Sequence, residues 1–139
     1  MSYEEKGKWV YVMAVVATYV AYVAVIVSRA DGGPLAGVAY VAPMLWAIGI
    51  SIVLTIVGSI VVGVVRPSDS TKADARDKEI DRRGEYVGGM VLGVLTVAPL
   101  GLAMVEADYF WIANAIYAAC VLANVVSSSV KLVAYRRGL

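Results

Sequence analysis

Four long stretches without a charged residue constrain this chain more than any other feature of its sequence. They cover residues 9–28, 32–65, 86–105 and 109–130. A helix rises about 1.5 Å per residue, so roughly 20 apolar residues cross a hydrocarbon core of about 30 Å. Glycine and proline interrupt the start of the second stretch, so its helix is expected at 41–65. The sequence therefore predicts an all-α integral membrane protein with four transmembrane helices, at 9–28, 41–65, 86–105 and 109–130.

The composition supports this prediction. Of the 139 residues, 60% are hydrophobic and 17% are charged, and the mean hydropathy is +0.76. A soluble domain is usually about 45 to 50% apolar. The chain has no histidine and one cysteine, Cys120. These counts exclude a histidine general base, a histidine-ligated haem, a cysteine and histidine zinc site and an internal disulfide. We expect a protein that is not an enzyme, without catalytic residues, cofactor or metal.

The basic residues predict the orientation of the helices. Eleven of the twelve lysines and arginines precede the first span, follow the last one, or lie in the connection at 66–85, and Arg29 lies in the first short connection. Connections rich in lysine and arginine stay in the cytoplasm. Both termini, the loop at 66–85 and the tail at 131–139 are therefore expected there. Short outer connections make spans one and two, and spans three and four, antiparallel hairpins of a single four-helix bundle.

Small residues at helical spacing predict where helices pack closely. In the second span they recur every fourth residue after Ala47, at Ser51, Thr55, Ser59 and Gly63. The third span has a GxxxG motif at Gly89 and Gly93. Such faces let two helix backbones approach each other in lipid. They are expected within the bundle, and the alternative is the seam of a homodimer.

Polar residues in the first and last spans also share faces. The last span carries Asn114, Tyr117, Asn124 and Ser128 at helical spacing, with Lys131 continuing the stripe just past its end, and the first carries Tyr11, Thr18 and Tyr22. An amide without a partner in hydrocarbon is costly, so both asparagines should point inward. We expect a buried polar seam of hydrogen bonds between helices. The alternative is a path for a small ligand or ion, which is less favoured because none of the four spans contains an ionisable carboxylate, lysine or arginine.

The connection at 66–85 carries six basic and six acidic residues. Asp74 with Lys78, and Glu79 with Arg83, are i,i+4 pairs that favour a solvated helix beginning near Ser70. Because the charges cancel, the loop is expected to contact a protein rather than lipid headgroups or nucleic acid. The residues expected to contact this partner are Asp74, Arg76, Asp77, Glu79, Ile80, Asp81, Arg82 and Arg83.

Three runs of residues carry a resemblance to a known family. They are Ala-Asp-Ala-Arg-Asp-Lys-Glu-Ile-Asp-Arg-Arg-Gly-Glu at 73–85, Phe-Trp-Ile-Ala-Asn-Ala at 110–115 and Val-Ala-Tyr-Arg-Arg-Gly at 133–138. With them the chain resembles a family of small bacterial four-span inner-membrane proteins of unknown function. Lys78 stands where that family often has Arg, and Ala75 where it often has Glu. The resemblance implies a role in controlling a helix-turn-helix transcriptional regulator, and it supplies no catalytic residues.

Three functional hypotheses follow. The first is a non-enzymatic membrane protein, a scaffold or sensor, whose charged loop contacts a cytoplasmic partner. The second is a small transporter or channel formed by a homo-oligomer, which the aligned small-residue and polar faces favour. The third is an accessory subunit of a larger membrane complex, which the same small-residue faces would fit.

Overall fold

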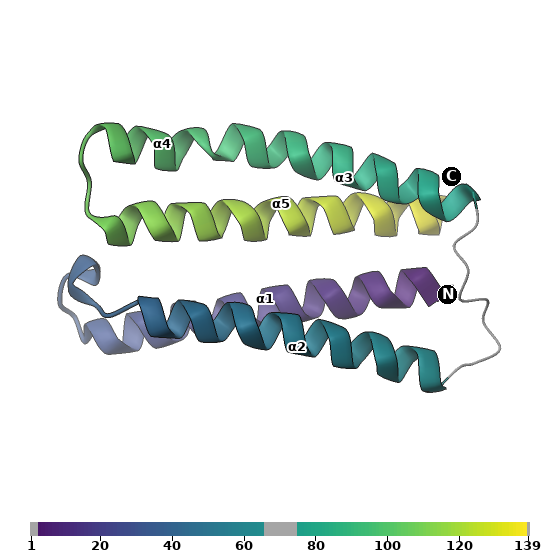
Figure 1. Ribbon diagram of the computed structural model, residues 1–139, viewed down its shortest axis with the longest axis horizontal. Coiled ribbons are helices and arrows are strands. Elements are labelled where there is room, and N and C mark those ends of the chain that lie inside the picture. The colour runs from purple at the N-terminus through teal and green to yellow at the C-terminus, as the bar shows by residue number, and fades with distance from the viewer. Residues whose placement is uncertain (1–2, 66–74, 139) are drawn as a thin grey trace.

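The computed structural model of the protein describes residues 3–65 and 75–138. Its regular structure is helical throughout these ranges (Figure 1). The elements in chain order are α1 (Tyr3–Ala30), the 3-10 helix η1 (Leu35–Gly37), α2 (Val41–Val65), α3 (Ala75–Leu95), α4 (Val97–Met104) and α5 (Tyr109–Arg137). Four helices are long and apolar enough to cross a membrane when α3 and α4 are taken together. The predicted all-α class with four helices of spanning length is confirmed.

Three helices extend further than the predicted spans, and α1 does so at both ends, from Tyr3 to Ala30. Helix α3 begins at Ala75, well before residue 86, and α5 continues to Arg137 through most of the expected tail. Arginine, lysine, glutamate and alanine are strong helix formers, so the charged extensions can continue the helical turns that the apolar stretches impose. Residues 75–85 are therefore helical, and the part of the predicted loop at 66–74, which includes Asp74, lies outside the described residues.

Backbone conformation explains where several helices end. After α1, Asp31 and Gly32 adopt φ values of 45° and 77°, and the chain reverses toward α2. Gly138 has φ 71° after α5, and its N–H donates to the Ala134 carbonyl. Between α3 and α4 the helix is interrupted at Thr96. Pro99 lacks an N–H and cannot bond to the carbonyl four residues earlier, which makes a break near this position expected.

The helices pack in the order α2, α1, α5 and then α3 with α4 (Figure 1). Helices α1 and α2 form one hairpin, and α3, α4 and α5 form the other. The hairpins meet where α1 contacts α5. Both ends of the chain lie at one end of the molecule, beside the start of α3 (Figure 1). The two outer positions in this order belong to α2 and to α3 with α4.

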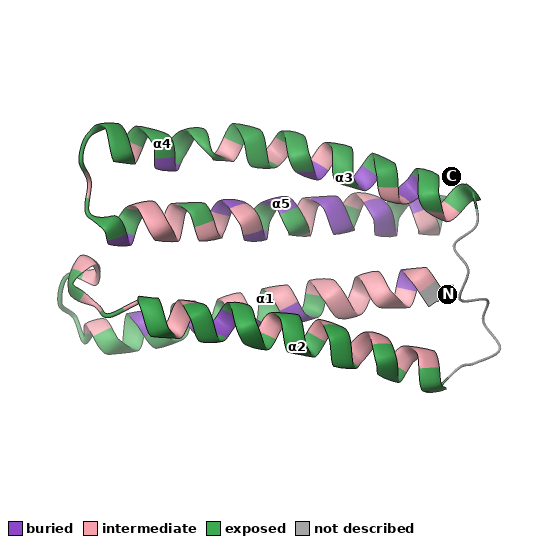
Figure 2. Ribbon diagram, in the orientation of Figure 1, coloured by how far each residue is buried: buried purple, intermediate pink, exposed green. Residues whose placement is uncertain are grey.

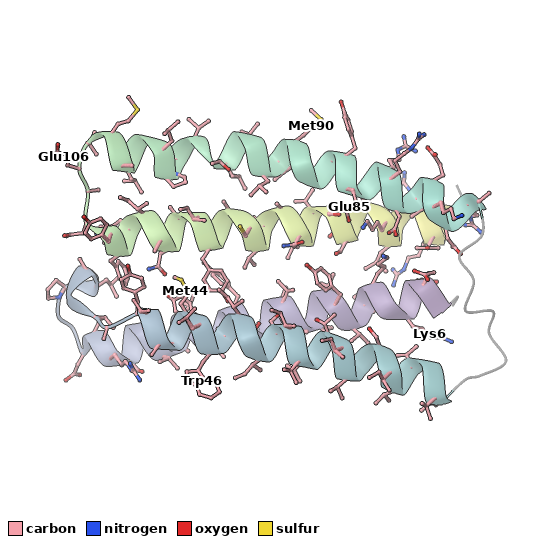
Figure 3. The ribbon with its side chains drawn as sticks, viewed as in Figure 1. Lys6, Met44, Trp46, Glu85, Met90 and Glu106 are labelled. Carbon is pink, nitrogen blue, oxygen red and sulfur yellow. The ribbon has the colours of Figure 1, made fainter. Side chains whose placement is uncertain are left out.

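Buried residues concentrate on α5 and are scarce on α2, where Ala47 is the buried residue (Figure 2). An apolar core cluster near the η1 end contains Tyr22, Ile26, Ala47 and Phe110. Many large apolar side chains instead face outward, and Trp46 is 72% exposed (Figure 3). In a bilayer, lipid tails would cover these exposed apolar side chains. Helices in lipid have little hydrophobic drive to bury such side chains against one another.

Candidate functional site

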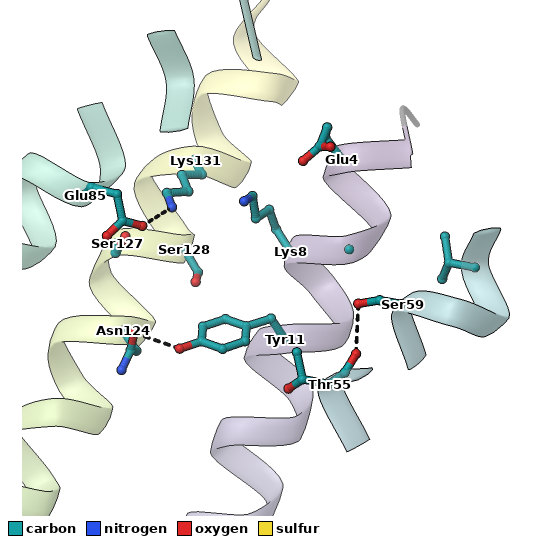
Figure 4. A pocket seen from close by; sticks show the side chains of 12 residues that line it. Glu4, Lys8, Tyr11, Thr55, Ser59, Glu85, Asn124, Ser127, Ser128 and Lys131 are labelled. Atoms are coloured by element: carbon teal, nitrogen blue, oxygen red, sulfur yellow. Dashed lines mark hydrogen bonds and ion pairs between the residues drawn. The ribbon is translucent and has the colours of Figure 1, made fainter. Parts of the chain in front are cut away.

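An ion-pair cluster joins three helices at the end of the molecule where the chain termini lie. Asp81 Oδ1 of α3 lies 2.8 Å from Lys8 Nζ of α1 and 3.1 Å from Lys131 Nζ of α5. The Lys131 ammonium also donates a hydrogen bond to Glu85 of α3 (Figure 4). The Lys131 side chain is 6% exposed. Two carboxylates compensate this buried charge, which would cost several kcal/mol if left alone.

The cluster changes the expectation for the charged segment. Ile80 is 4% exposed, so it belongs to the packed side of α3 and not to a displayed loop. Asp81 is held by two lysines, and Asp77 Oδ1 accepts a hydrogen bond of 3.0 Å from the Tyr135 hydroxyl. Ile80 is therefore buried and not displayed for a partner, whereas the Asp81 side chain is 46% exposed and pairs with lysines of α1 and α5.

The remaining charged side chains of this segment form what we call the exposed face of α3. It consists of Arg76, Lys78, Glu79, Arg82, Arg83 and Glu85. Four of these six residues are basic, whereas the two charged residues of 75–85 that are less exposed, Asp77 and Asp81, are both acidic. Folding therefore sorts the charges in part: two of the four acidic side chains, Asp77 and Asp81, turn toward α1 and α5, and the outward face keeps a basic excess. The cancellation expected from the sequence does not hold for this face.

The expected polar seam brings together two pairs of residues from α1 and α5. The Tyr11 hydroxyl donates a 2.8 Å hydrogen bond to Asn124 Oδ1, and the Tyr22 hydroxyl donates a 2.6 Å bond to Asn114 Oδ1. Each asparagine amide also donates to a carbonyl of its own helix, one turn earlier. These bonds tie the two hairpins together at two levels.

The other residues of the predicted seam are placed differently. The Thr18 hydroxyl donates to the Ala14 carbonyl of its own helix at 2.7 Å. Tyr117 packs edge-on against Tyr22, with 5.2 Å between the ring centroids. Ser128 is buried and lines a cavity beside Lys131. The seam is thus a mixture of hydrogen bonds, aromatic contacts and cavity wall.

The predicted small-residue face of α2 lines cavities. The hydroxyls of Thr55 and Ser59 donate 2.8 Å bonds to the carbonyls of Ser51 and Thr55, and these three residues line the space between α2 and α5. Gly63 is half-buried at the end of the series. The close approach of α2 to α1 occurs at Gly58 instead, where an added Cβ would overlap Val10.

The GxxxG motif of α3 points away from the rest of the chain. An added Cβ at Gly89 or Gly93 would meet no atom within 4 Å. The expectation that this motif packs within the bundle is wrong. Gly88 makes the close approach, because its added Cβ would lie 2.7 Å from the Ser127 Cβ of α5, and Gly84 makes room for the Lys131 stem in the same way. The homodimer seam remains a prediction for Gly89 and Gly93.

Two neighbouring cavities lie between α2 and α5, with α1 as their common wall. The polar cavity, of about 440 Å³, is lined by Glu4, Lys8, Glu85 and Lys131 and by several hydroxyl groups (Figure 4). The apolar cavity, of about 600 Å³, is lined mainly by aliphatic and aromatic side chains. Tyr11, Thr55 and Asn124 line both. We call the two cavities together the groove.

Sequence reasoning missed the ion-pair cluster and the groove. Lys8, Glu85 and Lys131 stand in three separate segments, and each lies within a few residues of the end of an apolar stretch. Lys131 also continues the polar stripe of the last span. That position was the one available signal, since a lysine on an inward stripe needs an acidic partner.

Comparisons of this chain with known protein families, with curated proteins and with solved structures found no match. The resemblance described from the sequence therefore stays a prediction.

Proposed function

We propose that this chain is a non-enzymatic, multi-pass protein of the bacterial inner membrane, and that the exposed face of α3 binds a cytoplasmic protein. In this proposal both termini and residues 66–85 lie in the cytoplasm, as the distribution of basic residues favours. The ion-pair cluster then lies near the inner membrane surface. The bundle acts as a scaffold or sensor that holds the exposed face in a defined orientation.

The charge sorting on α3 is the observation that carries the proposal. Ile80 and Gly84 are buried, and Asp81 is engaged by Lys8 and Lys131. These contacts fix the rotation of the helix, so the basic side chains project together. Arg82 pairs with Glu79 on the surface at 2.8 Å. An exposed pair of this kind contributes about 0 to 1 kcal/mol, so it is readily exchanged for a partner.

The basic excess of the exposed face favours a partner with an acidic surface. Arg136 and Arg137 extend the basic character, because the last turn of α5 lies beside the first turn of α3. Complementary charge accelerates association and selects between partners. The sequence resemblance adds a partner class, a transcriptional regulator, and DNA would be reached only through that partner.

The test places a photo-crosslinking amino acid at Arg83 in native membranes. Val94 is the matched control, because residues eleven apart project from the same side of a helix and Val94 is 72% exposed at a different depth. We expect a crosslinked protein of one defined mass at Arg83 and none at Val94. Charge reversal in Arg82→Glu should weaken that product. A pattern at Arg83 limited to lipid or to the chain itself would contradict the proposal.

A further inference from the structure

The groove between α2 and α5 combines a charged end with a long apolar end. Its charged residues are two lysines, Lys8 and Lys131, and two glutamates, Glu4 and Glu85. Equal numbers of cations and carboxylates line this end, and both lysines also pair with Asp81 behind the wall. Charges of both signs are therefore exposed to the cavity, which complements a headgroup that also carries both signs. Carboxylates in the wall would repel a purely anionic headgroup, and lysines would repel a purely cationic one.

The apolar end has the length of one acyl chain. Its lining on α2 runs from Met44 to Ile56, which is about 18 Å at 1.5 Å per residue. Half of a hydrocarbon core is about 15 Å thick. In Figure 3, Met44 projects from α2 on the side of α5, whereas Trp46 projects away from the bundle. The groove exists because α2 packs on α1, and its face of small residues leaves space beside α5.

The two ends adjoin each other. Tyr11, Thr55 and Asn124 line both cavities, and the Tyr11 hydroxyl is bonded to Asn124 across their common wall (Figure 4). Cavities of 300 to 1,000 Å³ are typical of small-molecule sites, and both cavities fall within this range. Lys131, whose side chain is 6% exposed, borders the polar cavity and gives it a fixed charged wall.

We propose that the groove binds one zwitterionic phospholipid, with the phosphate near Lys8 and Lys131, the ammonium near Glu4 and Glu85, and one acyl chain along α2. This site shares Glu85 with the exposed face of α3 but otherwise lies on α1, α2 and α5, and it does not depend on the proposed protein partner. A lipid in this site would differ from the lipid that surrounds any membrane protein, because the site selects its headgroup.

Cys120 provides a direct test, because it lines the apolar cavity and is the only cysteine in the chain. The full chain, purified in detergent, is alkylated with N-ethylmaleimide while phosphatidylethanolamine or phosphatidylglycerol is added. Bound lipid should slow alkylation of Cys120, by about tenfold once phosphatidylethanolamine reaches about ten times its dissociation constant. A higher concentration of phosphatidylglycerol should be needed to slow the alkylation of Cys120 equally.

Two variants serve as controls. Leu122→Cys in a Cys120→Ser background places the thiol on an exposed part of α5 that does not line the groove, and its alkylation should not distinguish the two lipids. Glu4→Gln removes one carboxylate from the polar cavity and should reduce the preference for phosphatidylethanolamine. Equal protection of Cys120 by both lipids, or equal protection of positions 120 and 122, would overturn the proposal.

Discussion

Lys131 and Asp81 connect helices that lie far apart in the sequence. One Asp81 oxygen forms ion pairs with a lysine of α1 and a lysine of α5, so one carboxylate joins both hairpins. The Asp81 side chain is 46% exposed, and that of Lys131 is 6% exposed. Solvent screens part of the interaction with Asp81, but Lys131 cannot regain water without moving α3. The pair should therefore contribute more to stability than a surface ion pair does.

Asp81→Asn tests this difference at the residue scale. The variant keeps the size of the side chain and removes the charge that Lys8 and Lys131 share. We expect it to lower the free energy of unfolding by about 1.5 to 3 kcal/mol, the range for hydrogen bonds to charged groups. Glu79→Gln is the control, because its pair with Arg82 is exposed and should change stability by less than about 1 kcal/mol.

The measurement is an unfolding titration in mixed detergent micelles, followed by circular dichroism. A loss in Asp81→Asn no larger than in Glu79→Gln would mean that the cluster does not hold the hairpins together.

At the scale of the element, α3 presents three different surfaces. Its glycines Gly84 and Gly88 face α5, its basic side chains face outward at one end, and Gly89 and Gly93 face outward further along. A one-residue step separates Gly88 from Gly89, yet only the first is in close contact with another helix. Packing within the chain and packing between copies can thus be separated by adjacent substitutions.

Gly88→Ala should destabilise the contact between α3 and α5. The new methyl group would lie 2.7 Å from Ser127 Cβ, and overpacking of this kind costs about 1 to 3 kcal/mol. Gly89→Ala should leave the unfolding free energy of the monomer unchanged or raise it by up to about 1 kcal/mol, because alanine favours helix and no atom is close. The same detergent titration compares the two variants.

Light scattering, which measures the mass of the protein in its detergent complex, tests whether the chain forms a homodimer. If the wild type were dimeric and Gly89→Ala monomeric, the exposed glycines would form the homodimer seam that the sequence suggests. Similar destabilisation of both monomers would contradict the assigned rotation of α3.

For the whole molecule, the contact between α1 and α5 decides the architecture. Two hairpins meet along this line, held by Tyr11 with Asn124, Tyr22 with Asn114, and the ion-pair cluster. Because α2 packs on α1, space remains between it and α5, and that space is the groove. The proposed orientation puts the charged end of the molecule in the cytoplasm.

Cysteine labelling tests this orientation. In a Cys120→Ser background, single cysteines replace Lys78 on α3 and Asp108 in the turn before α5, and both positions are exposed. In intact spheroplasts, a membrane-impermeant maleimide should label position 108 and should label position 78 only after permeabilisation. The reverse pattern would contradict the proposed topology, and labelling of both in intact spheroplasts would contradict a membrane between them.

The sequence by itself determined the helical class, the four helices of spanning length and the bounds of α2. These properties are local, since an apolar stretch in lipid must satisfy its backbone hydrogen bonds within its own helix. Only the tertiary structure decided which glycines of α3 make contact, that Ile80 and Asp81 turn inward, and that a groove lies beside α5. These features depend on how helices rotate and pack against distant segments, so neighbours such as Gly88 and Gly89 cannot be told apart by spacing along the chain.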